Sequence, residues 1–202
     1  MDVDLILASE TFQYTGSFKF RAAYNVAVKV PHEFIIAASS GNFGQALAYA
    51  CQLLAKRCTI VMPETSVQAK IDAVREYGGT LDLVNVNMKS RAKRVAELAA
   101  EHPDAYVASA YDDPLVIEGN ATLGMELASL RRAFDFVIAP IGGGGLTSGI
   151  ITGLRACHRN VPVFGAEPLL ANDAARSLRA GRIVANDAEP QTIADGARVV
   201  SV

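Results

Sequence analysis

The stretch FDFVIAPIGGGGLTSGIITGLRAC, residues 134–157, decides the fold class of this chain. It contains a short apolar strand, then four successive glycines, then an amphipathic helix. A strand that is apolar on both faces is typical of a parallel sheet covered by helices. The same alternation of short apolar runs and longer amphipathic runs recurs along the chain. It predicts an α/β fold with doubly wound, mostly parallel sheets.

Outward from this unit, the pattern predicts strands and helices in regular alternation. The strands are expected at 34–38, 58–62, 81–86, 105–109, 134–140 and 161–167. The helices are expected at 17–29, 44–55, 66–78, 90–102, 116–133, 146–157 and 170–181. Because ligands bind at the carboxyl ends of parallel strands, the loops that follow the strands are where we look for chemistry.

The composition excludes several classes of protein. Half of the 202 residues are hydrophobic, so the chain can bury a substantial core. A net charge of −2 provides no excess of positive charge for a nucleic-acid partner. Three cysteines without a CxxC pair favour a reducing compartment over a disulfide framework. No apolar run is long enough to span a membrane and the N-terminus lacks signal-peptide features, so we expect a cytoplasmic protein.

The glycine run PIGGGGLTSG, residues 140–149, is the first candidate binding loop. Without Cβ atoms, its backbone amides can approach an anion closely, and the following helix adds unpaired amides and the positive end of its dipole. The run matches neither the GxGxxG dinucleotide pattern nor a P-loop. A phosphate cradle is therefore favoured over a flexible turn.

A second loop, SSGNFGQ at residues 39–45, follows the strand at 34–38 and opens a helix. Its hydroxyl, amide and glycine residues suit the binding of a carboxylate. The alternative is a helix cap with a tight turn, because serine and asparagine are favoured caps in any case. The loop alone does not decide between the two.

The third segment is TGSFK, residues 15–19. Ser17 is expected to cap a helix, which puts Lys19 in the first helical turn. The helix dipole disfavours a cation there, so the pKa of Lys19 should be lowered, as Schiff-base chemistry requires. An exposed lysine is the alternative. A reactive lysine, a carboxylate loop and a phosphate cradle together point to pyridoxal phosphate as the cofactor.

These segments resemble those of the fold-type II pyridoxal-phosphate enzymes, in the branch of the threonine/serine dehydratases and serine racemases. The resemblance rests on five ordered motifs: ETFQYTGSFKFRAA (10–23), SSGNFGQALAYA (39–50), PIGGGGLTSG (140–149), GAEPLLANDAARS (165–177) and EPQTIADG (189–196). It implies two lobes of the tryptophan synthase β type, a small lobe at 40–110 and a large cofactor-binding lobe at 1–39 and 111–202. Relatives of this branch are longer at both ends, so the C-terminal part of the fold is expected to be missing.

The resemblance also implies roles for individual residues. Lys19 would bind the cofactor covalently and move the α-proton, and Ser40 would be the acid/base on the opposite face in racemases. The cofactor would be held by Phe18, Lys19, Asn42, Gly142, Gly143, Gly144, Gly145 and Leu146. The substrate would be held by Ser39, Ser40, Gly41, Asn42 and Gln45. Glu167, the Ala171 carbonyl and Asp173 match a site for Mg²⁺ or another divalent cation. An acidic helix cap remains the alternative for that trio.

The implied reaction is the elimination that converts L-threonine or L-serine to a 2-oxo acid and ammonia, with a place in isoleucine biosynthesis. A serine or related amino-acid racemase is one alternative. A catalytically inactive fragment or assembly module is another, because the chain is short. The expected partners are a small amino-acid substrate and further copies of the chain, since relatives are often dimers.

Overall fold

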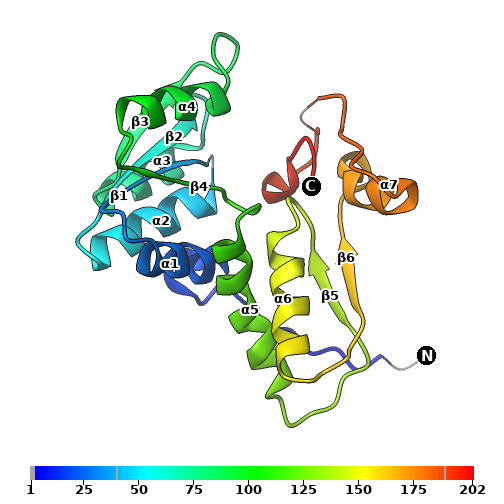
Figure 1. The fold of residues 1–202 in the computed structure, drawn as a ribbon. Coiled ribbons are helices and arrows are strands. Elements are labelled where there is room, and N and C mark those ends of the chain that lie inside the picture. The colour runs from blue at the N-terminus through cyan, green and yellow to red at the C-terminus, as the bar shows by residue number, and fades with distance from the viewer. Residues whose placement is uncertain (1–2, 40, 189) are drawn as a thin grey trace.

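Strand β1 (Phe34–Ala38) lies inside a four-stranded parallel sheet with the order β3-β2-β1-β4. Its neighbours are β2 (Arg57–Pro63) and β4 (Tyr106–Ala108), and β3 (Thr80–Val84) forms the other edge. The computed structural model describes residues 3–39, 41–188 and 190–202. Figure 1 shows this sheet in one lobe and a second, smaller sheet in the other.

Both faces of the four-stranded sheet are covered by helices, as an apolar parallel sheet requires. Ile35 and Ala37 of β1 pack with α1 (Lys19–Lys29), α2 (Asn42–Leu53) and α3 (Gln68–Glu76). Phe34 and Ile36 point to the opposite face, where Leu98 of α4 (Arg91–Glu101) covers them. The sheet is therefore doubly wound.

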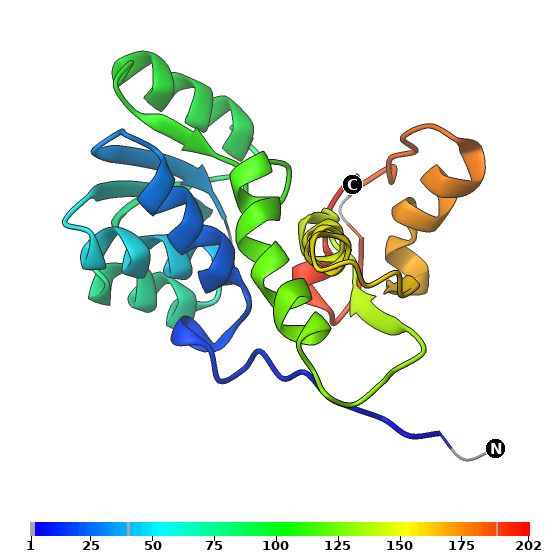
Figure 2. The same cartoon turned by 60° about the horizontal axis from the view of Figure 1, so that its bottom comes forward.

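The second lobe is built around the parallel pair β5 (Val137–Pro140) and β6 (Val163–Ala166). Helix α6 (Gly145–Ala156) connects these strands, and α5 (Pro114–Ala128) packs between α6 and α1. The last α-helix of the described residues is α7 (Asp173–Ala180), and the chain then returns to lie beside α6, as Figure 2 shows in red.

All the predicted strands and helices are present, and both sheets are parallel, which confirms the predicted fold class. The ends differ by a few residues, most at α5, which was expected at 116–133. Its start moves because the Asp113 side chain caps the helix by accepting a hydrogen bond from the Leu115 amide at 2.8 Å. The predicted lobe division stays a prediction, but the pairing of β1 with β2 and β4 places 34–38 with the sheet of the 40–110 lobe.

The strand order places a topological switch point between β1 and β4. From β1 the chain builds the sheet outward through β2 to β3, and then returns to add β4 on the other side of β1. In such sheets the loops on the two sides of a switch point lead apart, and ligands bind beside them at the carboxyl ends of the strands. Both loops lie beside the N-terminus of α1.

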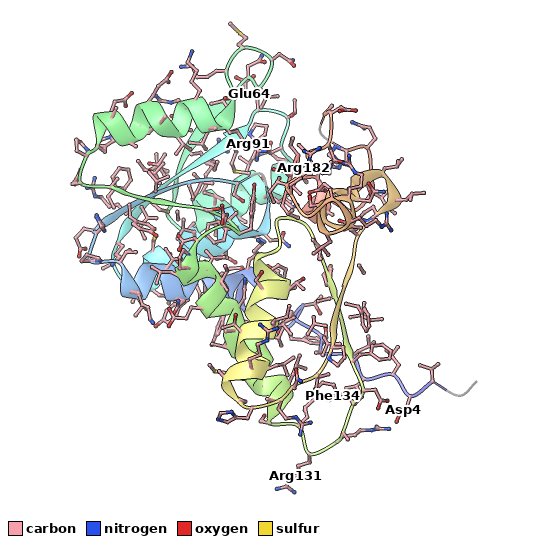
Figure 3. The ribbon with its side chains drawn as sticks, turned by 45° about the vertical axis from the view of Figure 1, so that its right-hand side comes forward. Asp4, Glu64, Arg91, Arg131, Phe134 and Arg182 are labelled. Carbon is pink, nitrogen blue, oxygen red and sulfur yellow. The ribbon has the colours of Figure 1, made fainter. Side chains whose placement is uncertain are left out.

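The connection from α5 to β5 forms one end of the second lobe. Figure 3 labels Arg131 and Phe134 there, and places Arg182 toward the other end of the lobe. No helix within the described residues is long and apolar enough to cross a membrane.

Candidate active site

Lys19 opens α1, and its amine contacts a backbone carbonyl from a distant part of the chain. The Lys19 Nζ donates a hydrogen bond to the Ala110 carbonyl oxygen at 2.7 Å. The same nitrogen lies 5.1 Å from the centre of the Phe18 ring and 5.8 Å from the centre of the Phe43 ring. Desolvation by these surroundings lowers the pKa of Lys19 to about 8. An amine with this pKa is neutral often enough near neutral pH to act as a nucleophile or base.

The cause of the lowered pKa differs from the one expected. Ser17 does not cap the helix: α1 begins at Lys19, Phe18 occupies the cap position, and no side chain caps it. The Ser17 hydroxyl is buried and has no hydrogen-bond partner among the described residues. The first-turn position of Lys19 is confirmed, and burial accounts for the shift in its pKa.

The loop at 39–45 is organised by the Ser39 hydroxyl. This oxygen accepts hydrogen bonds from the Gly44 amide at 2.9 Å and the Gly41 amide at 3.3 Å. Gly44 must be glycine for packing, because a Cβ there would lie 2.8 Å from Cγ2 of Ile60 on β2. Ser39 is itself buried. It shapes the turn that the cap alternative predicted, and a role in carboxylate binding stays a prediction.

The other predicted residues of this loop lie in different environments. Asn42 begins α2 and is exposed, so its amide group is open to a ligand. Gln45 donates from Nε2 to the Thr15 carbonyl oxygen at 3.1 Å and so ties the loop to the turn before Lys19. Ser40 lies outside the described residues.

The glycine run forms the start of α6. Gly144 takes the cap position with a left-handed φ of 82°, a conformation that favours glycine. Within the described part of the chain, the amides of Gly142, Gly143 and Gly144 donate no hydrogen bond. The first-turn amides of α6 lack helical partners as well. Leu146 has its side chain in the core, so only its backbone can face a ligand.

The segment after β4 joins the lysine to the glycine run. Ala110 provides the carbonyl that Lys19 contacts, and the ring of Tyr111 lies against Gly143, where a Cβ would come within 2.1 Å of it. The Tyr111 carbonyl oxygen would lie 2.7 Å from a Cβ on Gly145. Phe43 links the loop at 39–45 to the same amine. The three sequence motifs therefore meet at one place.

The sequence reasoning missed Ala110 and Tyr111. The signal was SAYDDP, residues 109–114, which follows a predicted strand and precedes a helix. The Ser109 hydroxyl accepts hydrogen bonds from the amides of Tyr111 and Asp112 and so forms a tight turn there. A side-chain pattern does not reveal a backbone carbonyl as a partner, and this contact needed coordinates.

The predicted cation trio is only partly assembled. Glu167 accepts hydrogen bonds from the amides of Ala174 and Ala175 and so caps α7, as the alternative predicted. Asp173 is buried, and its Oδ2 has no partner among the described residues. The described residues contain no cluster of three histidine, cysteine or acidic side chains that could hold a metal ion.

Comparisons with known proteins find relatives that match nearly the whole of this chain. The model of the family described as pyridoxal-phosphate dependent enzyme matches residues 1–202. The chain is 40% identical over 196 residues to the beta-hydroxyaspartate dehydratase of Paracoccus denitrificans, covering 95% of this chain and 62% of that one. It is 36% identical over 198 residues to the serine racemase of Dictyostelium discoideum, covering 96% of this chain and 61% of that one.

Among solved structures, a threonine deaminase from T.th. superposes with a TM-score of 0.89 at 40% identity. The match covers 96% of this chain and 64% of that chain. The chain therefore spans a little over 60% of the length of the proteins that it resembles.

Proposed function

Because the chain belongs to the pyridoxal-phosphate dependent enzymes of fold type II, we propose that it catalyses the α,β-elimination of L-threonine or L-serine to a 2-oxo acid and ammonia. One observation carries this proposal. The Lys19 amine, with its lowered pKa, contacts Ala110, and the next residue, Tyr111, packs on the glycine run. A nucleophilic amine of α1 and the loop of unpaired amides before α6 thus contact the same two neighbouring residues, Ala110 and Tyr111.

The described residues fit a phosphorylated aldehyde. The amides of Gly142 to Gly144 and the start of α6 suit a phosphate dianion, since the helix dipole adds positive potential. We propose that these amides, with those of Gly145 and Leu146, bind the phosphate. Lys19 would hold the aldehyde carbon covalently, Phe18 would pack beside the ring, and Asn42 would donate to the ring oxygen.

Pyridoxal phosphate supplies an electron sink for the charge that develops at the substrate Cα. When the substrate amino group takes its place on the aldehyde carbon, Lys19 would be freed as a neutral amine and would accept the Cα proton. The loop at 39–45 holds the substrate carboxylate and so orients the Cα–H bond toward Lys19. For threonine, the Cα–H and Cβ–O bonds break and water leaves. Water is consumed again when ammonia is released, so threonine gives 2-oxobutanoate and ammonia.

Racemisation of serine or a related amino acid is the second candidate. The likeness to the Dictyostelium serine racemase favours it, and the same neutral Lys19 would serve on one face of Cα. The proton on the other face would come from Ser40. The two reactions share the first proton transfer and differ in the product.

We also propose a divalent cation, such as Mg²⁺, at the start of α7. The buried Asp173 Oδ2 without a partner supports it, because a buried carboxylate oxygen needs a compensating donor or ion. The Ala171 carbonyl and Glu167 would complete the oxygen ligands. Glu167 can contribute while it caps α7, since each carboxylate oxygen has a further lone pair.

The test is an assay of 2-oxo acid release with pyridoxal phosphate and either L-threonine, L-serine or 3-hydroxyaspartate. We expect release by the wild type and a fall of about 100-fold or more in Lys19→Ala, since this variant loses the proposed base. Lys93→Ala, which removes an exposed lysine of α4, is the matched control. Equal release by wild type and Lys19→Ala would refute the role of Lys19.

The same samples separate the alternatives. A changed enantiomer ratio without 2-oxo acid would identify a racemase. Absence of both products and of cofactor uptake would identify an inactive fragment or assembly module. Sedimentation of the chain with and without cofactor tests the proposed homo-oligomer, and localisation in the cytoplasm remains part of the proposal.

A further inference from the structure

The loop proposed to bind the substrate carboxylate, SSGNFGQ, contains no charged residue of its own. A cation reaches it from another element. Lys70 lies in the first turn of α3, and its Nζ is 3.4 Å from the position that a Cβ atom on Gly41 would take. Because Gly41 has no side chain, the ammonium group comes close to the backbone of the loop.

A second residue fixes this ammonium group from the other lobe. Lys70 forms an ion pair with Asp195, which opens the short 3-10 turn η3 (Asp195–Ala197) near the C-terminus. The neighbouring Gly196 carbonyl oxygen would lie 2.6 Å from a Cβ on Gly142. The residue that follows Asp195 therefore packs against the proposed phosphate loop.

The exposure of this pair argues against a purely structural tie between the lobes. The Asp195 side chain is 62% exposed and that of Lys70 is 22% exposed. An ion pair with one partner mostly in solvent contributes little to stability. The ion pair does, however, keep the long, flexible side chain of Lys70 over Gly41.

We propose that Lys70 is the cation of the substrate-carboxylate subsite and that Asp195 is the positioning residue that holds its ammonium group over Gly41. This inference rests on the proposed function, because it assumes that the loop at 39–45 receives the α-carboxylate. Lys70 has three N–H donors, so it can contact Asp195 and a substrate carboxylate together. The subsite takes small carboxylates in general, with or without an amino group.

The first experiment measures carboxylate binding without catalysis. Acetate is titrated into the cofactor-free chain while the amide resonances of Gly41 and Gly44 are followed by NMR. We expect saturable shifts in the wild type and a Kd raised about tenfold or more in Lys70→Gln, because one charge-assisted hydrogen bond is lost. Lys70→Arg retains the charge and should restore most of the affinity, and Lys93→Gln is the control.

Asp195 is tested by the same titration. Asp195→Asn should weaken acetate binding less than Lys70→Gln does, and Asp195→Glu should restore it. A structural tie would instead leave the Kd unchanged while the melting temperature fell. That result, or Lys70→Gln binding acetate as tightly as the wild type, overturns the proposal.

Kinetics separate this inference from the proposed function. In an active enzyme, Lys70→Gln should raise KM about tenfold or more and change kcat little, since the lost contact is made in the ground state as well as in the transition state. Turnover with an unchanged KM in Lys70→Gln refutes the inference and leaves the function standing. Lys70-dependent acetate binding in a chain without turnover refutes the function and supports the inference.

Discussion

The Lys19 Nζ and the carbonyl oxygen of Ala110 lie 2.7 Å apart, although 91 residues separate them in the sequence. The contact joins the start of α1 to the loop after β4, at the switch point of the four-stranded sheet. It also places the amine one residue away from Tyr111, which covers the glycine run. The reactivity of Lys19 therefore depends on how closely two loops and a helix end approach one another.

The lowered pKa of Lys19 gives a first prediction. Only the neutral amine attacks an aldehyde, so the rate at which the chain captures pyridoxal phosphate should rise as the pH rises through about 8 and level off above it. Below that midpoint the rate should fall about tenfold for each pH unit. Stopped-flow absorbance measures the rate. A midpoint near 10, the value of an ordinary lysine, would contradict the desolvated environment.

The glycine run gives a second prediction, based on Tyr111. Gly143→Ala should abolish cofactor uptake because its Cβ would come within 2.1 Å of the Tyr111 ring. Removing that ring in the double variant with Tyr111→Ala should restore folding and part of the uptake. Gly145→Ala should not be rescued in this way, because its Cβ would meet the Tyr111 backbone carbonyl.

Gly144→Ala tests the backbone conformation of the glycine run, whereas Gly143→Ala and Gly145→Ala test steric contacts with Tyr111. There is open space around the Cβ position of Gly144, but its φ of 82° is unfavourable for alanine. The free energy of unfolding should fall by about 1–2 kcal/mol, without any dependence on Tyr111. Urea denaturation measures this loss. If Tyr111→Ala rescued Gly144→Ala as well, the steric account of the loop would be wrong.

A third prediction concerns Arg21, two residues after Lys19. Its guanidinium group contacts both carboxylate oxygens of Glu10 and both of Glu126, and the Arg21 side chain is only 8% exposed. Arg21→Met should lower the free energy of unfolding by roughly 2–4 kcal/mol, below the full cost of breaking a buried pair because Glu126 is 61% exposed.

The matched control for Arg21 is Lys29→Met on the same helix. Lys29 pairs with Glu118, and both side chains are about half exposed, at 45% and 50%. Its loss should cost less than about 1 kcal/mol. Urea denaturation of the two variants checks the difference, and equal losses would show that Arg21 does not anchor α1.

A fourth prediction tests the cation site. Addition of Mg²⁺ should raise the melting temperature of the wild type, because an ion that binds only the folded chain stabilises it. Asp173→Asn should remove that response, since the amide cannot supply the buried charge. A melting temperature unaffected by Mg²⁺, Mn²⁺ and Ca²⁺ in the wild type would leave Glu167 with its capping role alone.

The fold could be predicted from sequence because its strands are short and apolar, and its helices are separated from them by clear turn residues. FIIAA at 34–38 coincides with β1 to the residue. The errors lie at the ends of strands and helices: β5, expected at 134–140, begins at Val137. At helix ends, single hydrogen bonds decide. The cap at Asp113 makes α5 begin at Pro114, before the start at 116 that the hydrophobic pattern predicts. Ser17, which was expected to cap α1, does not do so.

The candidate site was predicted less completely, for physical reasons. Motifs made of particular side chains and glycines, such as those around Lys19 and Gly144, can be recognised in the sequence. Contacts through backbone carbonyls, such as that of Ala110, cannot be recognised in this way, because every residue has a carbonyl group. The same is true of Lys70, an ordinary helix lysine by its surroundings in sequence, whose ion pair with Asp195 spans 125 residues.

The most direct test of the central claim is to identify the lysine that captures the cofactor. The chain is incubated with pyridoxal phosphate, reduced with borohydride, digested and analysed by mass spectrometry. The account predicts one dominant phosphopyridoxyl modification, on Lys19, and its loss in Lys19→Ala with no transfer to Lys70. Labelling spread over the exposed lysines, or undiminished in Lys19→Ala, would contradict it.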